Sequence, residues 1–261
     1  MGGYEGGQEA SRLAVETVRD VYSRAPNGDP QAALLRALQS AHECIRNYAN
    51  GHPGHYGMGT TCTALVLKGD SLHFAHVGDS RLYLARGAEI SQLTRDHSYV
   101  SRLVQSGLIS LKEAENHPQR HILTAALGNA NGLVPHIPDY PVPLENRDIL
   151  VLCTDGLWGQ VSPGELRDVV CTKAPSEACR ELVKLARERG GPDNITVQLL
   201  YLGRSGHEPC SCGKPGPISS PGSRAFPCKV QIDASFGQCE VLYHHCKLLI
   251  IRPLVDGLRL W

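Results

Sequence analysis

The sequence predicts a mixed α/β fold in which antiparallel sheets pack against amphipathic helices. Three observations lead to this prediction. Apolar residues recur every three to four positions over residues 7–45, which is typical of helices that bury one face. The apolar period changes to two over residues 61–93, as it does in strands. Further strand-like segments at 147–153 and 195–202 enclose helical patterns, so helices and strands alternate as in a layered sandwich.

Two helices are predicted at the start of the chain. The first covers residues 7–25, where Leu13 and Val18 belong to an apolar stripe and charged side chains lie on the opposite face. A segment of Pro, Asn and Gly then breaks the pattern. The second helix follows, with Asp29 as a suitable N-cap and Pro30 as a suitable first helical residue.

Short strands are expected next, at 61–68, 71–77, 81–86 and 90–93. Residues 68–70 provide a tight hairpin turn between the first two. The remaining elements are helices at 99–106, 111–116, 163–171 and 176–189, and strands at 147–153 and 195–202. Ser110 is a possible cap for the second of these helices. This order fits a two-layer or a four-layer α/β sandwich with antiparallel sheets.

The composition changes after residue 203. Residues 205–223 are dense in Gly, Pro and Ser, which cannot bury a core. We therefore expect a domain over residues 1–203 and a Gly/Pro/Ser/Cys-rich tail over 204–261 without an independent fold.

The charge balance excludes several classes of function. The 26 Lys and Arg residues equal the 26 Asp and Glu residues, so no electrostatic signal for nucleic acid or for an anionic membrane is expected. No run of about eighteen apolar residues predicts a membrane span. The first residues do not have the pattern of a secretory signal, which favours a cytoplasmic protein.

Three aspartates follow or precede predicted strands on turns that contain glycine. Asp155 comes directly after a buried apolar strand, and Asp193 precedes the last strand. Asp79 lies in the segment 78–81, which we expect to link two hairpin strands. Any one of them alone is most simply a residue that shapes a turn. Together, three carboxylates are the kind of oxygen ligands that hard divalent cations require.

The sequences of these turns resemble motifs of a known family. Three segments are similar to motifs of the metal-dependent PPM-type (type 2C) serine/threonine protein phosphatases, in a form typical of bacterial members. They are Cys153-Thr154-Asp155-Gly156-Leu157-Trp158, Gly190-Gly191-Pro192-Asp193-Asn194-Ile195-Thr196 and Gly78-Asp79-Ser80-Arg81. The resemblance runs from Met1 to about Leu202. It implies a four-layer α-β-β-α sandwich of two antiparallel sheets flanked by helices.

The resemblance also implies a site and an activity. Asp155 and Asp193 would be ligands of the catalytic metal centre, and Asp79 would contribute to a third, weaker ion site. The cofactor would be two ions of Mn²⁺ or Mg²⁺, whereas zinc is less expected because no Cys or His belongs to the motifs. The reaction would be hydrolysis of phosphoserine or phosphothreonine on a protein substrate by a metal-activated water. We expect a monomer that binds neither nucleic acid nor membrane.

The segment 93–98 also matches the family pattern. Within it, His97 is a candidate proton-handling group, and Asp96 and His97 are alternatively residues that cap the following helix or support the fold.

The sequence departs from the family pattern at three places. The family's bridging aspartate would lie just before Met1, so we expect the first strands of the fold to be missing. Tyr4 stands where bacterial-type members have His, and Ala125 stands where Arg is common. These departures leave open a catalytically impaired pseudophosphatase that binds phosphoproteins.

A second alternative is a metal or interaction module built from Cys and His residues of the tail, namely Cys210, Cys212, Cys228, Cys239, His244, His245 and Cys246. Their spacing matches no zinc motif.

Overall fold

The structure of the 261-residue chain is a computed structural model. It describes residues 4–24, 28–130, 132–191, 193–202, 229–231 and 247–253. The tail cysteines and histidines considered above as a metal module lie outside these described residues.

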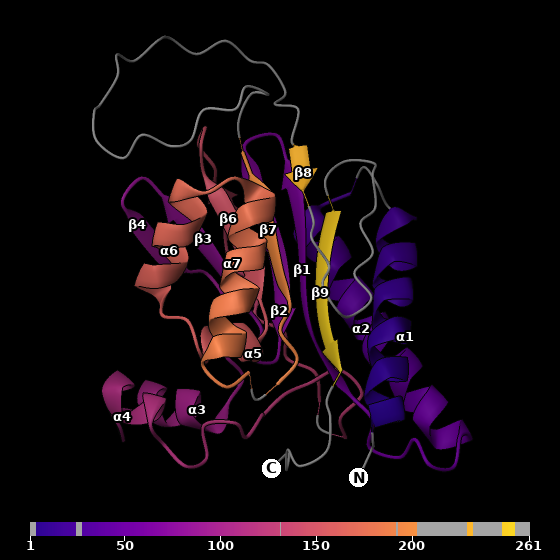
Figure 1. The fold of residues 1–261 in the computed structure, drawn as a ribbon. Helices are drawn as coiled ribbons and strands as arrows, with labels where there is room; N and C mark the ends of the chain where they lie inside the picture. Colours follow the sequence, from indigo (N-terminus) through magenta and orange to yellow (C-terminus); the bar gives the residue numbers. More distant parts are fainter. Residues whose placement is uncertain are drawn as a thin grey trace.

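Two long helices open the chain. Helix α1 covers Tyr4–Ser23, close to the predicted 7–25, and α2 covers Pro30–Gly51 and begins at the predicted Pro30. The Asp29 carboxylate accepts hydrogen bonds from the main-chain amides of Gln31 and Ala32, which confirms it as the N-cap of α2. The two helices lie side by side on one face of the molecule (Figure 1).

Four strands form the first sheet, in the order β5-β2-β1-β9. Their bounds are Thr60–Lys68 for β1, Ser71–Val77 for β2, Val142–Pro143 for β5 and Lys247–Pro253 for β9. Strands β1 and β2 pair antiparallel up to Lys68 opposite Ser71, so the predicted hairpin turn is confirmed. Gly69 has a φ of 59°, a conformation that glycine adopts without strain.

Five strands form the second sheet, in the order β4-β3-β6-β7-β8. Their bounds are Arg81–Arg86 for β3, Glu89–Gln92 for β4, Ile149–Cys153 for β6, Val197–Tyr201 for β7 and Lys229–Gln231 for β8. The expectation that residues 78–81 link two hairpin strands is therefore wrong. This turn carries the chain from one sheet to the other, because β2 pairs with β1 and β3 pairs with β4 and β6.

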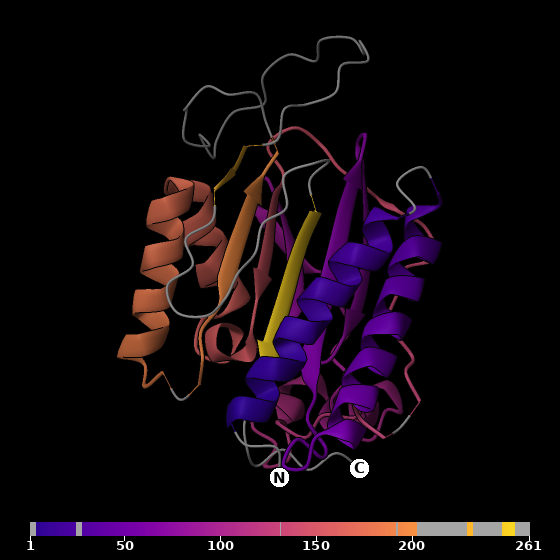
Figure 2. The ribbon, with the colours of Figure 1, turned by 90° about the vertical axis from the view of Figure 1, so that its right-hand side faces the viewer.

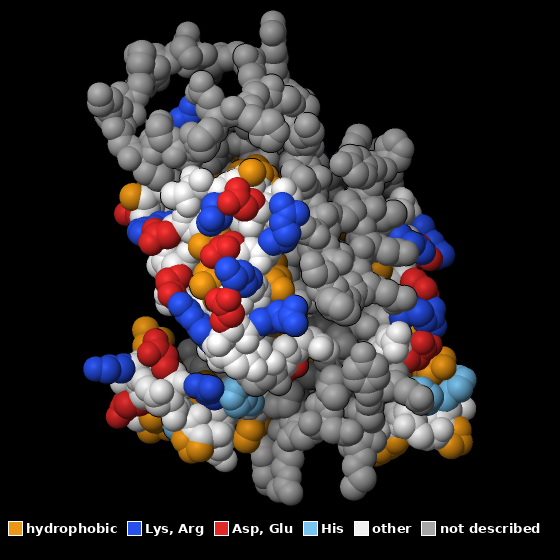
Figure 3. Space-filling view, in the orientation of Figure 1, with side chains coloured by type: hydrophobic (Ala, Val, Ile, Leu, Met, Phe, Trp, Pro, Cys, Tyr) orange, Lys and Arg blue, Asp and Glu red, His pale blue; other side chains and the backbone are white. Residues whose placement is uncertain are grey.

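The remaining helices follow β4 in the sequence. They are α3 at Tyr99–Gln105, α4 at Leu111–Glu115, α5 at Asp155–Trp158, α6 at Pro163–Thr172 and α7 at Pro175–Glu188. Ser110 forms a capping box with Glu113 at the start of α4, as its position predicted. On the face shown in Figure 3, acidic and basic side chains are intermixed over α6 and α7.

Three buried clusters define four layers. One cluster lies between α1, α2 and the first sheet and includes Leu34, Ile45 and Val77. A second lies between the second sheet and α6 and α7. The third lies between the two sheets and includes Phe74 and Leu150. The predicted α-β-β-α sandwich is thus confirmed, with the helical pairs on the two outer faces (Figure 2).

The strands are apolar on both faces because each sheet is covered on both sides. In β6, Leu150 and Leu152 point to the other sheet, while Val151 and Cys153 point to the helices. Two segments after residue 203 pair with the edges of the sheets, β8 with β7 and β9 with β1. Within the described part of the chain, no helix has the length and apolar content needed to span a bilayer.

Candidate metal centre

The three predicted acidic turns lie at one end of the sandwich. In the second sheet, Arg81 is paired with Cys153, and Cys153 is paired with Val197. The turn before β3, the turn after β6 and the turn before β7 therefore lie at the same end of the strands. Helix α5 marks this end in Figure 1. The antiparallel register thus brings together segments that are far apart in the sequence.

Asp155 begins helix α5 directly after the fully buried strand β6. Its Oδ1 atom is buried. A Cβ atom added at Gly156 would lie 2.4 Å from the main-chain oxygen of Asn194, closer than any side chain allows. Glycine is therefore required at 156 for this turn to pack directly against the neighbouring one.

Asp193 lies on that neighbouring turn and is exposed. Its Oδ1 accepts a hydrogen bond of 2.7 Å from the amide of Asn194. The buried hydroxyl of Thr154 donates to the Asn194 carbonyl at 3.2 Å and accepts from the Thr196 amide at 3.0 Å. Thr154 therefore fastens the Asp155 turn to the Asp193 turn.

Asp79 is only 4% exposed, and its Oδ1 atom is buried. The preceding Gly78 has a φ of 108°, and a Cβ atom there would lie 2.3 Å from Thr61 Cγ2. Ser80 shares a hydrogen bond of 2.9 Å with the Thr61 hydroxyl. The Asp79 turn is thus packed tightly onto the start of β1, and only glycine is accommodated before it.

His97 supports this turn from the other side. Its Nδ1 accepts from the Gly78 amide at 3.1 Å, and its own amide donates to the Gly78 carbonyl at 2.7 Å. Burial lowers the pKa of His97, so the neutral imidazole is favoured. The cap of α3 is Ser98, whose hydroxyl accepts from the Ser101 amide, so the capping role expected for Asp96 and His97 is wrong and the supporting role of His97 is confirmed.

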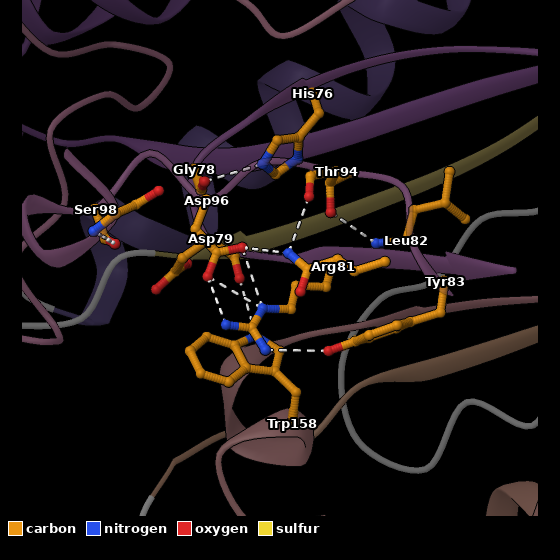
Figure 4. Close-up of polar contacts among 12 residues, drawn as sticks. His76, Gly78, Asp79, Arg81, Leu82, Tyr83, Thr94, Asp96, Ser98 and Trp158 are labelled. Carbon is orange, nitrogen blue, oxygen red and sulfur yellow. Dashed lines mark hydrogen bonds and ion pairs between the residues drawn. The ribbon is translucent and has the colours of Figure 1, made fainter. Parts of the chain in front are cut away.

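Arg81 and Asp96 form an ion pair beside these turns (Figure 4). The Arg81 guanidinium donates to both carboxylate oxygens of Asp96, with distances of 2.7 to 3.1 Å. It also donates to the Tyr83 hydroxyl at 3.1 Å. The Arg81 side chain is only 21% exposed, so its charge is largely buried in this pair.

The donors at this end of the sheets fit a hard divalent cation in type. Asp79, Asp155 and Asp193 offer only oxygen atoms, the ligands preferred by Mg²⁺ and Mn²⁺. Among the residues that the structure describes, no three Asp, Glu, His or Cys side chains gather closely enough to hold an ion. The structure thus places the three carboxylates on adjoining turns without forming a closed ligand set.

Sequence reasoning missed the residues that join the turns. Thr154 lies within a motif that was already singled out, yet its role was not recognised. Arg81 and Trp158 also belong to these motifs. A local signal therefore existed for all three, but their partners lie many residues away in the sequence.

Two facing antiparallel sheets flanked by helices, with acidic turns at one end, define an α-β-β-α sandwich protein with a candidate cation site. Within this class the chain belongs to the protein phosphatase 2C family, whose model matches residues 1–194.

Curated relatives support this assignment. The chain is 36% identical over 205 residues to the serine/threonine phosphatase Stp of Listeria welshimeri, covering 77% of this chain and 81% of that protein. It is 35% identical over 197 residues to the serine/threonine protein phosphatase PstP of Mycobacterium tuberculosis, covering 76% of this chain. The chain spans only 38% of the length of PstP.

Solved structures show the same fold. The crystal structure of Mycobacterium tuberculosis PstP matches with a TM-score of 0.73 at 34% identity, covering 78% of this chain and 86% of that chain. The PstP catalytic domain in complex with two manganese ions matches with a TM-score of 0.67 at 33% identity, covering 76% of this chain and 82% of that one.

Proposed function

We propose that this protein is a metal-dependent serine/threonine protein phosphatase that hydrolyses phosphoserine and phosphothreonine on protein substrates. The observation that carries the proposal is family membership over residues 1–194, together with relatives named as serine/threonine phosphatases. The three acidic turns at one end of the sheets support it, because their carboxylates offer the oxygen ligands that a hard divalent cation takes. We infer a phosphorylated protein as substrate and cytoplasmic action as a monomer.

Asp155 and Asp193 would hold the catalytic cations, and Asp79 would hold a further, weaker one. The manganese ions in the related PstP structure support Mn²⁺ or Mg²⁺ as the cofactor. When bound, such cations supply Lewis acidity, neutralise phosphate charge and lower the pKa of a coordinated water. The all-oxygen donor set of the three aspartates suits this role.

The chain's own residues would set the geometry of this chemistry. Thr154 holds the Asp155 and Asp193 turns together, so the two carboxylates keep a fixed relation. His97 and Thr61 fix the Asp79 turn. Positioned groups of this kind contribute to phosphoryl transfer mainly by orientation and electrostatics, since the reaction needs little covalent help from the protein.

The relatives described above are named as phosphatases, so none of them supports the alternative of a catalytically impaired binding module. It rests on the sequence departures at Tyr4 and Ala125. Ala125 is 8% exposed and belongs to the buried cluster between α1, α2 and the first sheet. These departures define the residues to test and do not favour the binding module over the enzyme.

The direct test is hydrolysis of a phosphothreonine peptide by the purified chain, in Mn²⁺ and in EDTA. We expect turnover in Mn²⁺ that EDTA abolishes. Asp155→Asn should reduce it at least a hundredfold, on the order of the loss of a group that stabilises the transition state directly. The matched control is Asp168→Asn, which changes an exposed carboxylate on α6 that pairs with the adjacent Arg167.

Two outcomes would overturn the proposal. One is a folded chain that shows no turnover with Mn²⁺ or Mg²⁺. The other is turnover that survives EDTA and the Asp155→Asn substitution, because the activity would then arise elsewhere.

A further inference from the structure

Trp158 connects two of the acidic turns. It ends helix α5, three residues after Asp155, and its indole Nε1 donates a hydrogen bond of 2.9 Å to the main-chain oxygen of Asp79. Figure 4 shows the indole lying directly beneath the Asp79 turn. The Trp158 side chain therefore reaches from the Asp155 turn to the main chain of Asp79, in the segment between β2 and β3.

The ring of Trp158 makes a second contact on its face. The guanidinium carbon of Arg81 lies 3.5 Å from the ring centroid, the geometry of a cation–π contact. Arg81 follows Asp79 by two residues, so the ring and its N–H group hold the same turn at two points. Such a contact is worth more when it is partly desolvated, as here, where Arg81 is mostly buried.

Asp96 fixes the orientation of the guanidinium. Its carboxylate accepts from Nε and Nη2 of Arg81, which leaves the planar group with little rotational freedom. Burial alone would lower the pKa of Arg81, but the Asp96 charge beside it more than offsets this effect and raises the pKa. Arg81 therefore keeps its charge on the indole face at neutral pH.

We propose that Trp158 and Arg81 are positioning residues that couple the Asp79 turn to the Asp155 turn and set the spacing of their carboxylates. This inference rests on the proposed function insofar as the carboxylates bind a cation. Neither residue touches the reacting atoms in this role. Their effect is exerted through the main chain of Asp79 and through helix α5, as an outer-shell partner orients a metal ligand.

Three substitutions separate the contributions. Trp158→Phe keeps an aromatic face for Arg81 and removes the N–H donor. Trp158→Leu removes both contacts. Arg81→Lys keeps the charge but loses the planar fork that binds Asp96 through two nitrogens.

The first measurement is hydrogen exchange of the amides of residues 78–80 in the metal-free protein. We expect Trp158→Phe to speed exchange there about fivefold, the ratio for loss of one hydrogen bond, and Trp158→Leu to speed it further. The control is Tyr201→Phe, which removes a hydrogen bond of 2.7 Å to the Val170 carbonyl near the opposite end of the strands. The control should leave exchange at 78–80 unchanged.

The second measurement is Mn²⁺ binding, followed by the electron paramagnetic resonance signal of free Mn²⁺. We expect Trp158→Phe and Arg81→Lys to weaken binding about tenfold, the lower end for loss of an outer-shell partner. With saturating Mn²⁺, the KM for phosphopeptide should stay unchanged, since neither residue is proposed to contact substrate.

The two measurements distinguish the failure of the inference from that of the proposed function. Unchanged exchange at 78–80 in both Trp158 variants would overturn the coupling, whatever the activity. Faster exchange in a protein that neither binds Mn²⁺ nor hydrolyses phosphopeptide would support the coupling of the turns and overturn the proposed function. Faster exchange with wild-type Mn²⁺ affinity would overturn the proposed influence on the cation site.

Discussion

The hydroxyl of Thr154 donates a hydrogen bond to the main-chain carbonyl of Asn194, forty residues later in the chain, at 3.2 Å. The same oxygen accepts from the Thr196 amide. One buried side chain thus satisfies an acceptor and a donor of the Asp193 turn. Hydrogen bonds to main-chain groups therefore join the turns of the candidate site, and the carboxylates belong to residues of these turns.

Replacing Thr154 tests this connection. Thr154→Val keeps the shape of the side chain but leaves the Asn194 carbonyl and the Thr196 amide without this partner. Each hydrogen bond contributes about 1 kcal/mol net, so we expect the loss of two to lower the free energy of unfolding by about 2 kcal/mol. Urea denaturation measures it. Thr154→Ser keeps the hydroxyl and should stay within about 1 kcal/mol of wild type; equal losses in both variants would mean that the methyl group matters more than the hydrogen bonds.

A methyl group at Gly156 should push the two turns apart. In Gly156→Ala the new Cβ would meet the Asn194 carbonyl at 2.4 Å, a contact that only a main-chain shift can relieve. We expect a destabilisation of about 1–3 kcal/mol and a large loss of phosphatase activity, since the shift moves Asp155 relative to Asp193. Thermal unfolding and peptide hydrolysis provide the two measurements.

Gly164→Ala is the matched control for this substitution. Gly164 lies in the first turn of α6, and an added Cβ there meets no atom within 4 Å. Its activity should equal that of wild type, and its stability should be unchanged or higher by up to about 1 kcal/mol, because alanine loses less backbone freedom in a helix. Equal activity losses in both variants would show that the damage at 156 is not specific to the turn.

Much of the fold could be predicted because its signals are local. The N-cap at Asp29, the capping box at Ser110 and the hairpin at Gly69 each depend on a few neighbouring residues. The assignment of strands to sheets could not be predicted in the same way. Strands such as β6 are apolar on both faces, so the alternation that would tell one face from the other is absent. For this reason the sequence predicts a hairpin connection at 78–81, whereas the turn joins the two sheets.

In the candidate site, too, only the features with local sequence signals could be predicted. The motifs located the three acidic turns, because Asp beside Gly at a strand end is a local pattern. The contacts that join the turns depend on partners forty to eighty residues away, as for Trp158 with Asp79. No spacing rule encodes such contacts, since they arise only when the strand register places the turns side by side.

Stability should fall when the pH drops below about 6.5, because of one buried and two half-buried histidines. Burial lowers the pKa of His136 to about 4, and His76 and His97 are shifted in the same direction for the same reason. The unfolded chain therefore binds protons that the folded chain does not, and the free energy of unfolding decreases from about pH 6.5 downwards. Urea midpoints between pH 7.5 and 5 measure this slope above the range in which most carboxylates titrate.

His136→Gln should make this slope shallower. His136 Nδ1 accepts from the Arg95 amide at 3.2 Å, and a glutamine oxygen can take over that role without titrating. His121→Gln, at an exposed position, should retain the wild-type slope. A slope unaffected by His136→Gln would show that the acid sensitivity comes from other groups.

The ion pair between Arg86 and Asp148 should contribute measurably to stability, unlike most surface pairs. Asp148 is only 1% exposed and receives hydrogen bonds of 2.8 and 2.7 Å from the Arg86 guanidinium. Arg86→Met leaves this carboxylate buried with the Glu145 amide still donating to it. We expect a loss of about 2 kcal/mol, below the usual cost of stranding a buried charge because the Arg86 side chain is 37% exposed. Arg167→Met, which breaks the more exposed pair with Asp168, should change the urea-derived free energy by less than about 1 kcal/mol. If both variants lose the same amount, burial of Asp148 does not determine the strength of its pair.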